Sequence, residues 1–225
     1  MTSSEQNIVP LTKERICQTA LAIADEQGLN SVSMRKLARE LGVEAMSLYY
    51  HVKNKDEILE GMIDEVFREI KIPKEGDWKT KIKQKAQATR DTLLRHPWGL
   101  GVIDSRKQPG PLTLKHHNTV IGVFKSAGFS IRDAARAFML IDSYIYGFVL
   151  QEMSLPLNQE NSPPTATRML EHSPEDAYPF LKELEIDYNA KPDYTFENEF
   201  NFGLDLILEG LERSYSSGKD QDLLS

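Results

Sequence analysis

The chain has 225 residues, of which 40% are hydrophobic and 27% charged, a balance typical of a globular protein with an apolar core. Its single cysteine, Cys17, excludes an internal disulfide and a zinc site built mainly from thiolates. The formal net charge of −7 excludes a uniformly basic nucleic-acid coat. Residues 1–15 show no signal peptide, and the most apolar window, 138–150, is shorter than the ~20 residues that cross a bilayer. We therefore expect a cytoplasmic protein without a membrane partner.

Charge is unevenly distributed along the chain. Residues 1–55 contain seven basic and six acidic side chains, a net charge of +1, whereas the rest of the chain carries −8. A slightly basic N-terminal part on an acidic body favours a DNA-binding module attached to an unrelated core.

Four helices are predicted within the first 72 residues. Side chains that accept hydrogen bonds from the first N–H groups of a helix precede three of them, namely Thr12, Ser33 and Asn54. Glycine, which adopts left-handed conformations at little cost, ends the first two, at positions 28 and 42. A short third helix is expected at 44–50, and Glu57 completes a capping box with Asn54 for the fourth. The polar run that starts at Pro73 ends this helix, so we place a domain boundary between 72 and 73.

The remainder of the chain, 73–225, is also predicted to be helical. The expected helices cover 78–95, 111–127, 130–153 and 195–214, with a short one beginning at Ser173 and Pro174. The helix over 130–153 is apolar on nearly all sides, which indicates burial on several faces. Gly203 and Gly210, two turns apart, are expected to let another backbone approach closely. No strand is predicted, so the fold class is all-α.

The two short helices joined at Gly42 form a helix-turn-helix, a motif whose second helix enters the DNA major groove. Side chains suited to phosphate contacts gather after it: Tyr49, Tyr50, His51, Lys53 and Lys55. Arg35 is placed to reach a guanine edge or a phosphate, and Ala45 and Met46 to contact thymine methyl groups. The alternative is a small helical subdomain whose exposed residues are basic and aromatic for no functional reason.

Two segments of this motif resemble a known family. Residues 35–44 (RKLARELGVE) and 48–55 (LYYHVKNK) closely resemble the DNA-binding domain of the tetracycline-repressor (TetR) family, over about 12–70. More loosely, 128–130 (GFS) and 202–212 (FGLDLILEGLE) resemble the body of the family's tetracycline-binding members. The resemblance implies a ligand-responsive transcriptional repressor with an N-terminal helix-turn-helix domain and a C-terminal ligand-binding and dimerisation domain. It also implies a homodimer, built through a four-helix bundle, that binds a palindromic double-stranded operator until a small-molecule effector releases it.

Carried over by position, the DNA-binding residues are Met34, Arg35, Ala45, Met46, Tyr49, Tyr50, His51 and Lys55. This chain departs from the family pattern at two of them. Ala45 stands in place of a base-reading glutamine, and Met46 in place of a proline. We therefore expect the operator sequence to differ from that of the tetracycline-binding members.

The resemblance also bears on the effector. The drug and magnesium contacts of the tetracycline-binding members fall on Lys71, Lys85, Thr89, Ile103, Arg106, Val120 and Gln151. The magnesium-binding histidine thus becomes Ile103, and an acidic residue near the metal becomes Gln151. Because isoleucine cannot coordinate a hard cation, we expect no metal, no cofactor and no tetracycline effector.

A different pocket is expected from helix faces that mix apolar and polar side chains. Trp78, Ile82, Ala86 and Leu93 share a stripe with Thr89, and Leu114, Ile121 and Phe124 share another with His117. The predicted pocket residues are Trp78, Thr89, Ile103, His117, Phe138, Tyr144 and Gln151, and they favour a mainly apolar effector bound without metal. A filled core without a cavity is the alternative.

Individual polar residues also leave alternatives open. His117 is either a satisfied core residue or a ligand contact, whereas the adjacent His116 and His117 point about 100° apart on a helix and cannot form a metal pair. Asp142 is either a capped or solvated carboxylate or the counter-ion of a cationic ligand.

Other classes of function are less well supported by the sequence. The chain contains no phosphate loop, nucleophile elbow or metal-spaced His–Glu cluster, and Cys17 falls in an apolar pattern, so we do not expect an enzyme. A ligand-binding adaptor that has lost DNA binding is a second alternative. The intact Tyr-Tyr-His cluster argues against it, because loss of DNA binding would be expected to replace these residues. A transcriptional activator of the same fold cannot be distinguished by sequence from a repressor.

Overall fold

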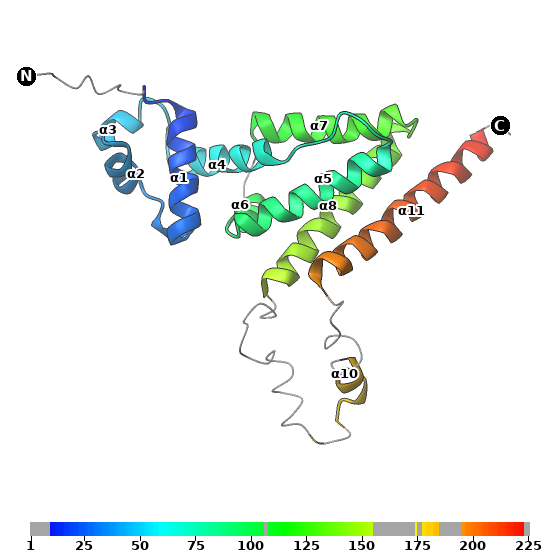
Figure 1. Ribbon diagram of the computed structural model, residues 1–225. Helices are drawn as coiled ribbons and strands as arrows, with labels where there is room; N and C mark the ends of the chain where they lie inside the picture. Colours follow the sequence, from blue (N-terminus) through cyan, green and yellow to red (C-terminus); the bar gives the residue numbers. More distant parts are fainter. Residues whose placement is uncertain (1–9, 106–107, 155–173, 175–176, 185–194, 223–225) are drawn as a thin grey trace, which may run out of the picture. The chain divides into compact units, whose positions relative to one another are not determined.

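The computed structural model describes residues 10–105, 108–154, 174, 177–184 and 195–222 (Figure 1). These residues form helices joined by loops, and no strand occurs among them, which confirms the all-α fold class. None of the described helices is long and apolar enough to span a membrane.

The chain divides into two compact units. The first comprises Met1–Ile72 together with Asp91–Val120, and the second comprises Pro73–Arg90 together with Ile121–Ser225. Residues 91–120 thus group with the N-terminal helices, a division that the sequence did not predict. The assignment of 1–72 and 73–225 to separate functional domains stays a prediction.

The first unit begins with the four predicted helices, α1 (Lys13–Gln27), α2 (Met34–Leu41), α3 (Ala45–Leu48) and α4 (Lys55–Glu69). A short 3-10 helix, η1 (Leu29–Ser31), lies between α1 and α2 and was not predicted. Thr12 accepts a hydrogen bond from the N–H of Arg15 at 3.2 Å, and Ser33 accepts one from Lys36 at 3.3 Å. Gly42, with φ 68° and ψ 33°, ends α2 in the left-handed conformation. These capping predictions are confirmed, and the local chemistry of the chain therefore sets the ends of the first two helices.

Helix α3 is shorter than the predicted span of 44–50. After Leu48 the backbone tightens, so that Tyr49, Tyr50 and His51 donate to carbonyls three residues earlier in the chain. This turn of i→i−3 hydrogen bonds replaces the last expected α-helical turn. Helix α4 then begins after the Asn54 cap.

The apolar faces of α1 and α4 form the core of the first unit. The predicted face of α1, which includes Ile16, Ala20 and Ile23, is buried, as are Ile58 and Met62 on α4. Burial of such side chains stabilises the fold by about 1.5–3 kcal/mol each for the larger ones. This apolar contact holds the helix-turn-helix in place.

Polar contacts attach residues 91–120 to the same core. Asp64 of α4 accepts hydrogen bonds at 3.0 Å from the N–H groups of Leu112 and Thr113, the first turn of α7 (Pro111–Ser126), and one at 2.8 Å from the Thr113 hydroxyl. His96 lies between two carboxylates, with Nδ1 2.8 Å from Asp25 and Nε2 3.3 Å from Glu69. A carboxylate at a helix N-terminus satisfies otherwise unpaired N–H groups, so Asp64 fixes the start of α7 against α4.

The second unit contains the remaining helices. Helix α5 (Trp78–Arg95) contributes its first part, followed by the end of α7, α8 (Ile131–Ser154), α10 (Pro179–Leu184) and α11 (Phe196–Asp222). The sequence missed α6 (Gly99–Ser105), a helix of the first unit. The predicted short helix lies later in the chain, as α10, and Ser173 falls outside the described residues.

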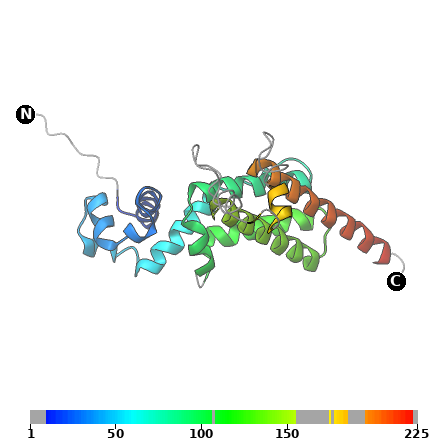
Figure 2. The same ribbon diagram turned by 90° about the horizontal axis from the view of Figure 1, so that it is seen from below.

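Aromatic side chains join the helices of the second unit. Phe129 stacks on Tyr215 at 4.2 Å between ring centroids, and Trp78 contacts the Phe129 ring at 5.2 Å. Figure 1 and Figure 2 both show α8 and α11 side by side, where the Tyr144 hydroxyl donates to the carbonyl of Phe200 at 2.9 Å. These contacts place the last helix against α8 and α5.

The two glycines of α11 differ in their surroundings. A Cβ atom at Gly203 would overlap the ring of Tyr144, whereas one at Gly210 would meet nothing within 4 Å. The close approach at Gly203 is therefore made by a side chain of the same chain rather than by another backbone. No described residue of the chain approaches Gly210 in the same way, so the expected close approach of another backbone at Gly210 stays a prediction.

We predict that Gly61→Ala destabilises the protein, although alanine usually favours a helix interior over glycine by about 1 kcal/mol. A Cβ atom at Gly61 of α4 would overlap the Sγ of Cys17 on α1, and overpacking of this kind costs about 1–3 kcal/mol. Denaturant unfolding measures the change.

Two further variants test the cause of this loss. Gly122→Ala in α7, where a Cβ meets nothing within 4 Å, should leave stability unchanged or raise it. Adding Cys17→Ala to Gly61→Ala should restore part of the loss, because it removes the overlapping sulfur. Equal effects of Gly61→Ala and Gly122→Ala would contradict the prediction.

Candidate nucleic-acid interface and polar core

The helix-turn-helix presents an unusual set of large exposed side chains. Met46 is 71% exposed and Tyr50 88%, and Arg35, His51 and Lys55 are also exposed. Exposed aromatic and apolar side chains grouped with basic ones occur more often in binding surfaces than on the rest of a protein's surface. We call the predicted DNA-binding residues (Met34, Arg35, Ala45, Met46, Tyr49, Tyr50, His51 and Lys55) the reading surface. Of these, Met34 and Ala45 are half-buried.

Buried apolar residues next to the exposed ones in the sequence hold this surface in place. Leu48 and Val52 are buried in the core between α1 and α4, whereas Tyr49 and Tyr50 between them face outward. The N–H of Val43 donates to the carbonyl of Ala38 at 3.0 Å, which closes the turn between α2 and α3. Burial of the apolar partners therefore fixes which side chains remain exposed.

The start of α4 forms the far end of the reading surface. Asn54 accepts from the N–H of Glu57 at 2.9 Å, as predicted, but Glu57 accepts from the N–H of Lys53 at 2.7 Å rather than from Asn54 itself. Glu57 also pairs with the Lys13 ammonium at 2.5 Å. The Lys13 hydrogen bond, and next the Lys53 N–H, hold the pKa of Glu57 below its ordinary value. Glu57 thus ties the turn that carries Lys53 and Lys55 to helix α1.

Cys17 lies in the same core and shows no sign of reactivity. Its side chain is buried, and burial raises the pKa of the Cys17 thiol to about 12. A thiol with such a pKa stays protonated at neutral pH and is a poor nucleophile. Among the residues that the structure describes, no cluster of three or more His, Cys, Asp or Glu side chains could hold a metal ion.

The predicted pocket residues have different surroundings. In the second unit Trp78 packs on Phe124 and Phe129, Thr89 is buried and Phe138 half-buried, whereas Gln151 is exposed. Tyr144 bonds α11 through its hydroxyl. Ile103 and His117 are half-buried residues of the first unit, where the His117 ring lies 5.8 Å from that of Phe67. That all seven residues line one pocket stays a prediction.

One residue of the expected stripes is placed differently. Leu114 is 54% exposed, although its spacing grouped it with Ile121 and the fully buried Phe124. Its part of α7 belongs to the first unit, whereas Ile121 and Phe124 belong to the second. The spacing along one helix therefore did not reveal that the helix changes its packing partners.

Two buried ion pairs between α5 and α8 were not predicted. Lys85 Nζ lies 2.6 Å from Asp142 Oδ1, and Arg90 Nε lies 2.8 Å from Glu152 Oε2. Asp142 is thus paired with a cation of its own chain, which neither of the two readings of Asp142 foresaw. The signal was present in part, since Lys85 falls between Ile82 and Thr89 on an otherwise apolar stripe. The partner was not readable, because it lies 57 residues away.

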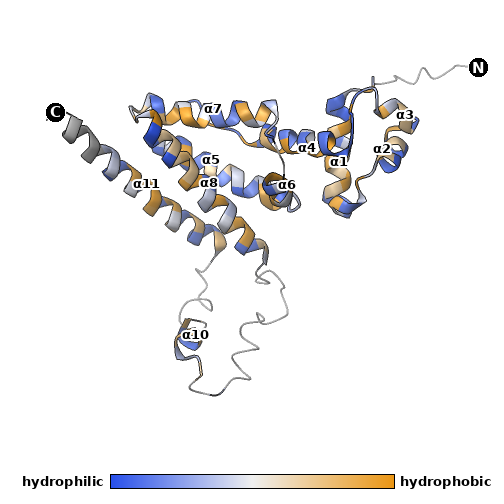
Figure 3. Ribbon diagram, turned by 180° about the vertical axis from the view of Figure 1, so that it is seen from behind, coloured by the Kyte–Doolittle hydropathy of each residue, from blue (hydrophilic) through white to orange (hydrophobic). Residues whose placement is uncertain are grey.

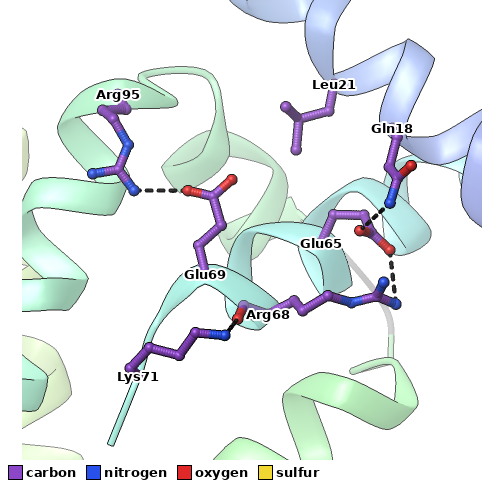
Figure 4. A pocket seen from close by; sticks show the side chains of 7 residues that line it. All are labelled: Gln18, Leu21, Glu65, Arg68, Glu69, Lys71 and Arg95. Carbon is purple, nitrogen blue, oxygen red and sulfur yellow. Dashed lines mark hydrogen bonds and ion pairs between the residues drawn. The ribbon is translucent and has the colours of Figure 1, made fainter.

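A cleft of about 530 Å³ opens in the first unit (Figure 4). Its lining residues are Gln18, Leu21, Glu65, Arg68, Glu69, Lys71 and Arg95. The charged groups largely bind one another: Arg68 lies 3.0 Å from Glu65, Arg95 lies 2.7 Å from Glu69, and Lys71 donates to the carbonyl of Arg68. This polar cleft does not resemble the apolar pocket that the sequence predicts.

Comparisons with known proteins agree with this architecture. A family model described as bacterial regulatory proteins of the tetR family matches residues 16–62, and one described as the tetracyclin repressor-like C-terminal domain matches 72–215. The chain is 32% identical to the HTH-type transcriptional repressor DrrR1 of Streptomyces coeruleorubidus, covering 90% of this chain and 77% of that protein. It is 28% identical to the class C tetracycline repressor of Escherichia coli, covering 95% and 96%. The crystal structure of Streptomyces coelicolor ActR in complex with actinorhodin matches with a TM-score of 0.75 and 29% identity, covering 92% and 99%.

We predict that Glu57→Gln lowers stability at pH 7 by about 1 kcal/mol or less, because it weakens a partly exposed ion pair. The pKa of Glu57 is lower in the folded protein than its ordinary value of 4.5. The carboxylate therefore contributes stability above that value, and the contribution is lost as the pH falls through the folded-state pKa. Melting temperatures between pH 7 and pH 3 should show the variant and the parent converging.

Glu44→Gln is the control, since the Glu44 side chain makes no capping hydrogen bond at the start of α3. Its difference from the parent should be small at every pH. A Glu57→Gln deficit that is as large at pH 3 as at pH 7 would show that the charge of Glu57 is not its cause.

Proposed function

This chain belongs to the TetR family of transcriptional regulators, and from that premise we propose that it is a ligand-responsive repressor that binds a palindromic operator as a homodimer. The observation that carries the proposal is the reading surface, in which Tyr49, Tyr50 and His51 stand exposed between Met46 and Lys55. The similar protein DrrR1 is named a repressor, which favours repression over activation. We place the protein in the cytoplasm, where its operator DNA lies.

The reading surface divides into two roles on chemical grounds. Arg35, in the first turn of α2, has the planar donor pair that bonds the O6 and N7 atoms of guanine. Lys55, the first residue of α4, carries a point charge suited to a phosphate. Ala45 and Met46 begin α3 with apolar groups that suit thymine methyl contacts. Arg35 would then select sequence, whereas Lys55 would supply affinity.

The homodimer is supported by the exposed faces of α8 and α11. Met139 is 68% exposed and Phe202 65%, and Figure 3 shows hydrophobic residues along both helices. Other large apolar residues exposed on these helices are Ile131, Leu140, Leu150, Met153 and Leu206. An apolar surface of this extent is unfavourable in water and is typical of a face that a second copy covers.

The proposed effector is a mainly apolar small molecule that binds the C-terminal domain without a metal ion. The similar structure of ActR contains bound actinorhodin, an example of an organic ligand in a protein of this fold. Release of the operator requires that the ligand binds the DNA-free conformation more tightly, since equal affinity for both conformations shifts nothing.

We predict that Lys55→Ala weakens binding to all DNA sequences and lowers the salt dependence by about one counterion per subunit. Arg35→Ala should instead lose discrimination at one base position per half-site, at a cost of about 1–3 kcal/mol. Fluorescence anisotropy with a selected operator and its single-base variants, at several salt concentrations, separates the two effects.

Two controls accompany this measurement. Arg35→Lys keeps the charge but not the bidentate geometry and should also lose discrimination. Lys115→Ala removes an exposed cation on α7 and should leave operator binding unchanged. If wild-type protein showed no sequence preference, the repressor assignment would fail, and if Lys55→Ala altered preference while Arg35→Ala did not, the two roles would be reversed.

We predict that Phe202→Glu with Leu206→Lys shifts the protein towards monomer, because the two side chains are exposed one turn apart on α11. Gly210→Leu should act in the same direction, whereas Gly203→Leu disturbs packing on Tyr144 and is not a clean test. Sedimentation at micromolar concentration measures the change. Leu114→Lys, at an exposed apolar residue of α7, is the control and should leave the oligomeric state unchanged. A wild type that sediments as a monomer would overturn the dimer.

A further inference from the structure

Lys85 is the most unusual buried residue of the second unit. It lies on α5 within an apolar stripe that includes Ile82 and Ala86, and its side chain is 2% exposed. Transfer of an ammonium group into such an environment is unfavourable unless the charge is paired and its N–H groups are hydrogen-bonded. The hydrogen bonds of Lys85 therefore show how much of the hydrogen-bonding capacity of its ammonium group the described residues use.

The described residues satisfy part of the ammonium group. Lys85 donates to Asp142 Oδ1 at 2.6 Å, and the part of the chain that the structure describes offers no second acceptor. A lysine ammonium has three N–H donors, so two of them have no acceptor among those residues. Asp142 needs fewer hydrogen bonds from the protein, because its side chain is 12% exposed and water can reach it.

The neighbouring ion pair, Arg90–Glu152, makes more contacts than Lys85–Asp142. Arg90 meets both carboxylate oxygens of Glu152 through Nε and Nη2, and its guanidinium lies 5.6 Å from the centroid of the Phe200 ring. This bidentate geometry matches the planar donors of arginine to both oxygens of one carboxylate. The described part of the chain thus gives Arg90 two carboxylate acceptors and a ring contact, whereas it gives Lys85 a single acceptor.

We propose that Lys85 recognises an acidic oxygen group, of which a carboxylate is the simplest, on an otherwise apolar effector. The inference rests on the proposed function and names the chemical class of its ligand. A carboxylate adds charge attraction to its hydrogen bond with an ammonium, and the two remaining N–H groups of Lys85 can donate to such an acceptor. The hydrogen bond to Asp142 orients the Lys85 side chain while the ligand is absent.

The residues around Lys85 fit a ligand with a single polar group. Ile82 and Ala86 are buried on the same stripe of α5, and Phe138 lies one turn before Asp142 on α8. Thr89, one turn after Lys85, already donates its hydroxyl proton to the Lys85 carbonyl at 2.7 Å. Sites with apolar walls and few polar groups are typical for small organic ligands, and here the polar group is a cation.

The test compares three probes of one shape and different charge: 2-naphthoate, its uncharged amide and 2-naphthylmethylamine. Each is titrated into the full-length chain with EDTA present, and melting temperature and operator release are measured. We expect naphthoate to bind the wild type about 10-fold more tightly than the amide. Lys85→Met should abolish this preference, whereas the control Lys83→Met, at a half-buried lysine paired with Asp205, should keep it.

A second variant protects against misfolding. If Lys85→Met leaves Asp142 unpaired and unfolds the protein, Lys85→Met combined with Asp142→Leu replaces the pair by apolar residues, an exchange that is often neutral for stability. This double variant should fold, bind operator and show no preference for the acid.

Several results would overturn the inference. These are equal binding of acid and amide, an unchanged preference in Lys85→Met, tightest binding of the amine with loss in Asp142→Asn, or no binding of any probe. Operator release by a probe independently of Lys85 would leave the proposed function intact while the inference fails. Absence of operator binding by the wild type would instead remove the proposed function, and the melting-temperature comparison would still decide the role of Lys85.

Discussion

Helix α4 packs against two parts of the first unit at once, helix α1 and residues 91–120, and the fold of this unit depends on both contacts. Its apolar stripe packs against α1 so closely that Gly61 faces the sulfur of Cys17. Two of its carboxylates contact residues 91–120: Asp64 accepts hydrogen bonds at the start of α7, and Glu69 approaches His96 and Arg95. Apolar packing fixes the distance between helices, whereas directional hydrogen bonds fix their register. The last residue of the reading surface, Lys55, is the first residue of this helix, so the position of that end of the surface follows from both kinds of contact.

The second unit combines the same two kinds of contact differently. Aromatic packing of Tyr144 on Phe200 joins α8 to α11, and buried ion pairs join α8 to α5. Buried ion pairs add little net stability, because desolvation of the charges offsets most of their attraction. Each pair sets one cation of α5 opposite one carboxylate of α8. Lys85 is a buried cation of this unit for which the described residues supply a single hydrogen-bond acceptor.

Much of the local structure follows from the sequence alone. Thr12, Ser33 and Asn54 begin helices where predicted, and Gly42 ends one, because a cap acts on backbone groups within about four residues. The long helices were predicted to within a few residues from apolar periodicity, except that α11 extends to Asp222. The exposure of candidate DNA-binding residues could also be predicted from the sequence, since the exposed Tyr49 and Tyr50 lie between the apolar, buried Leu48 and Val52.

The sequence by itself therefore determined the long helices, the capped helix starts and the exposed surface of the helix-turn-helix, because each depends on near neighbours in the chain. It did not reveal α6 or the early end of α3. Only the tertiary structure decided which helices meet. It grouped residues 91–120 with the N-terminal helices, gave Lys85 its partner Asp142, and placed Tyr144 against Gly203. Those pairings join residues that are tens of positions apart, so that no local pattern encodes them; they arise when apolar faces are buried together and the charged groups carried along with them must find partners.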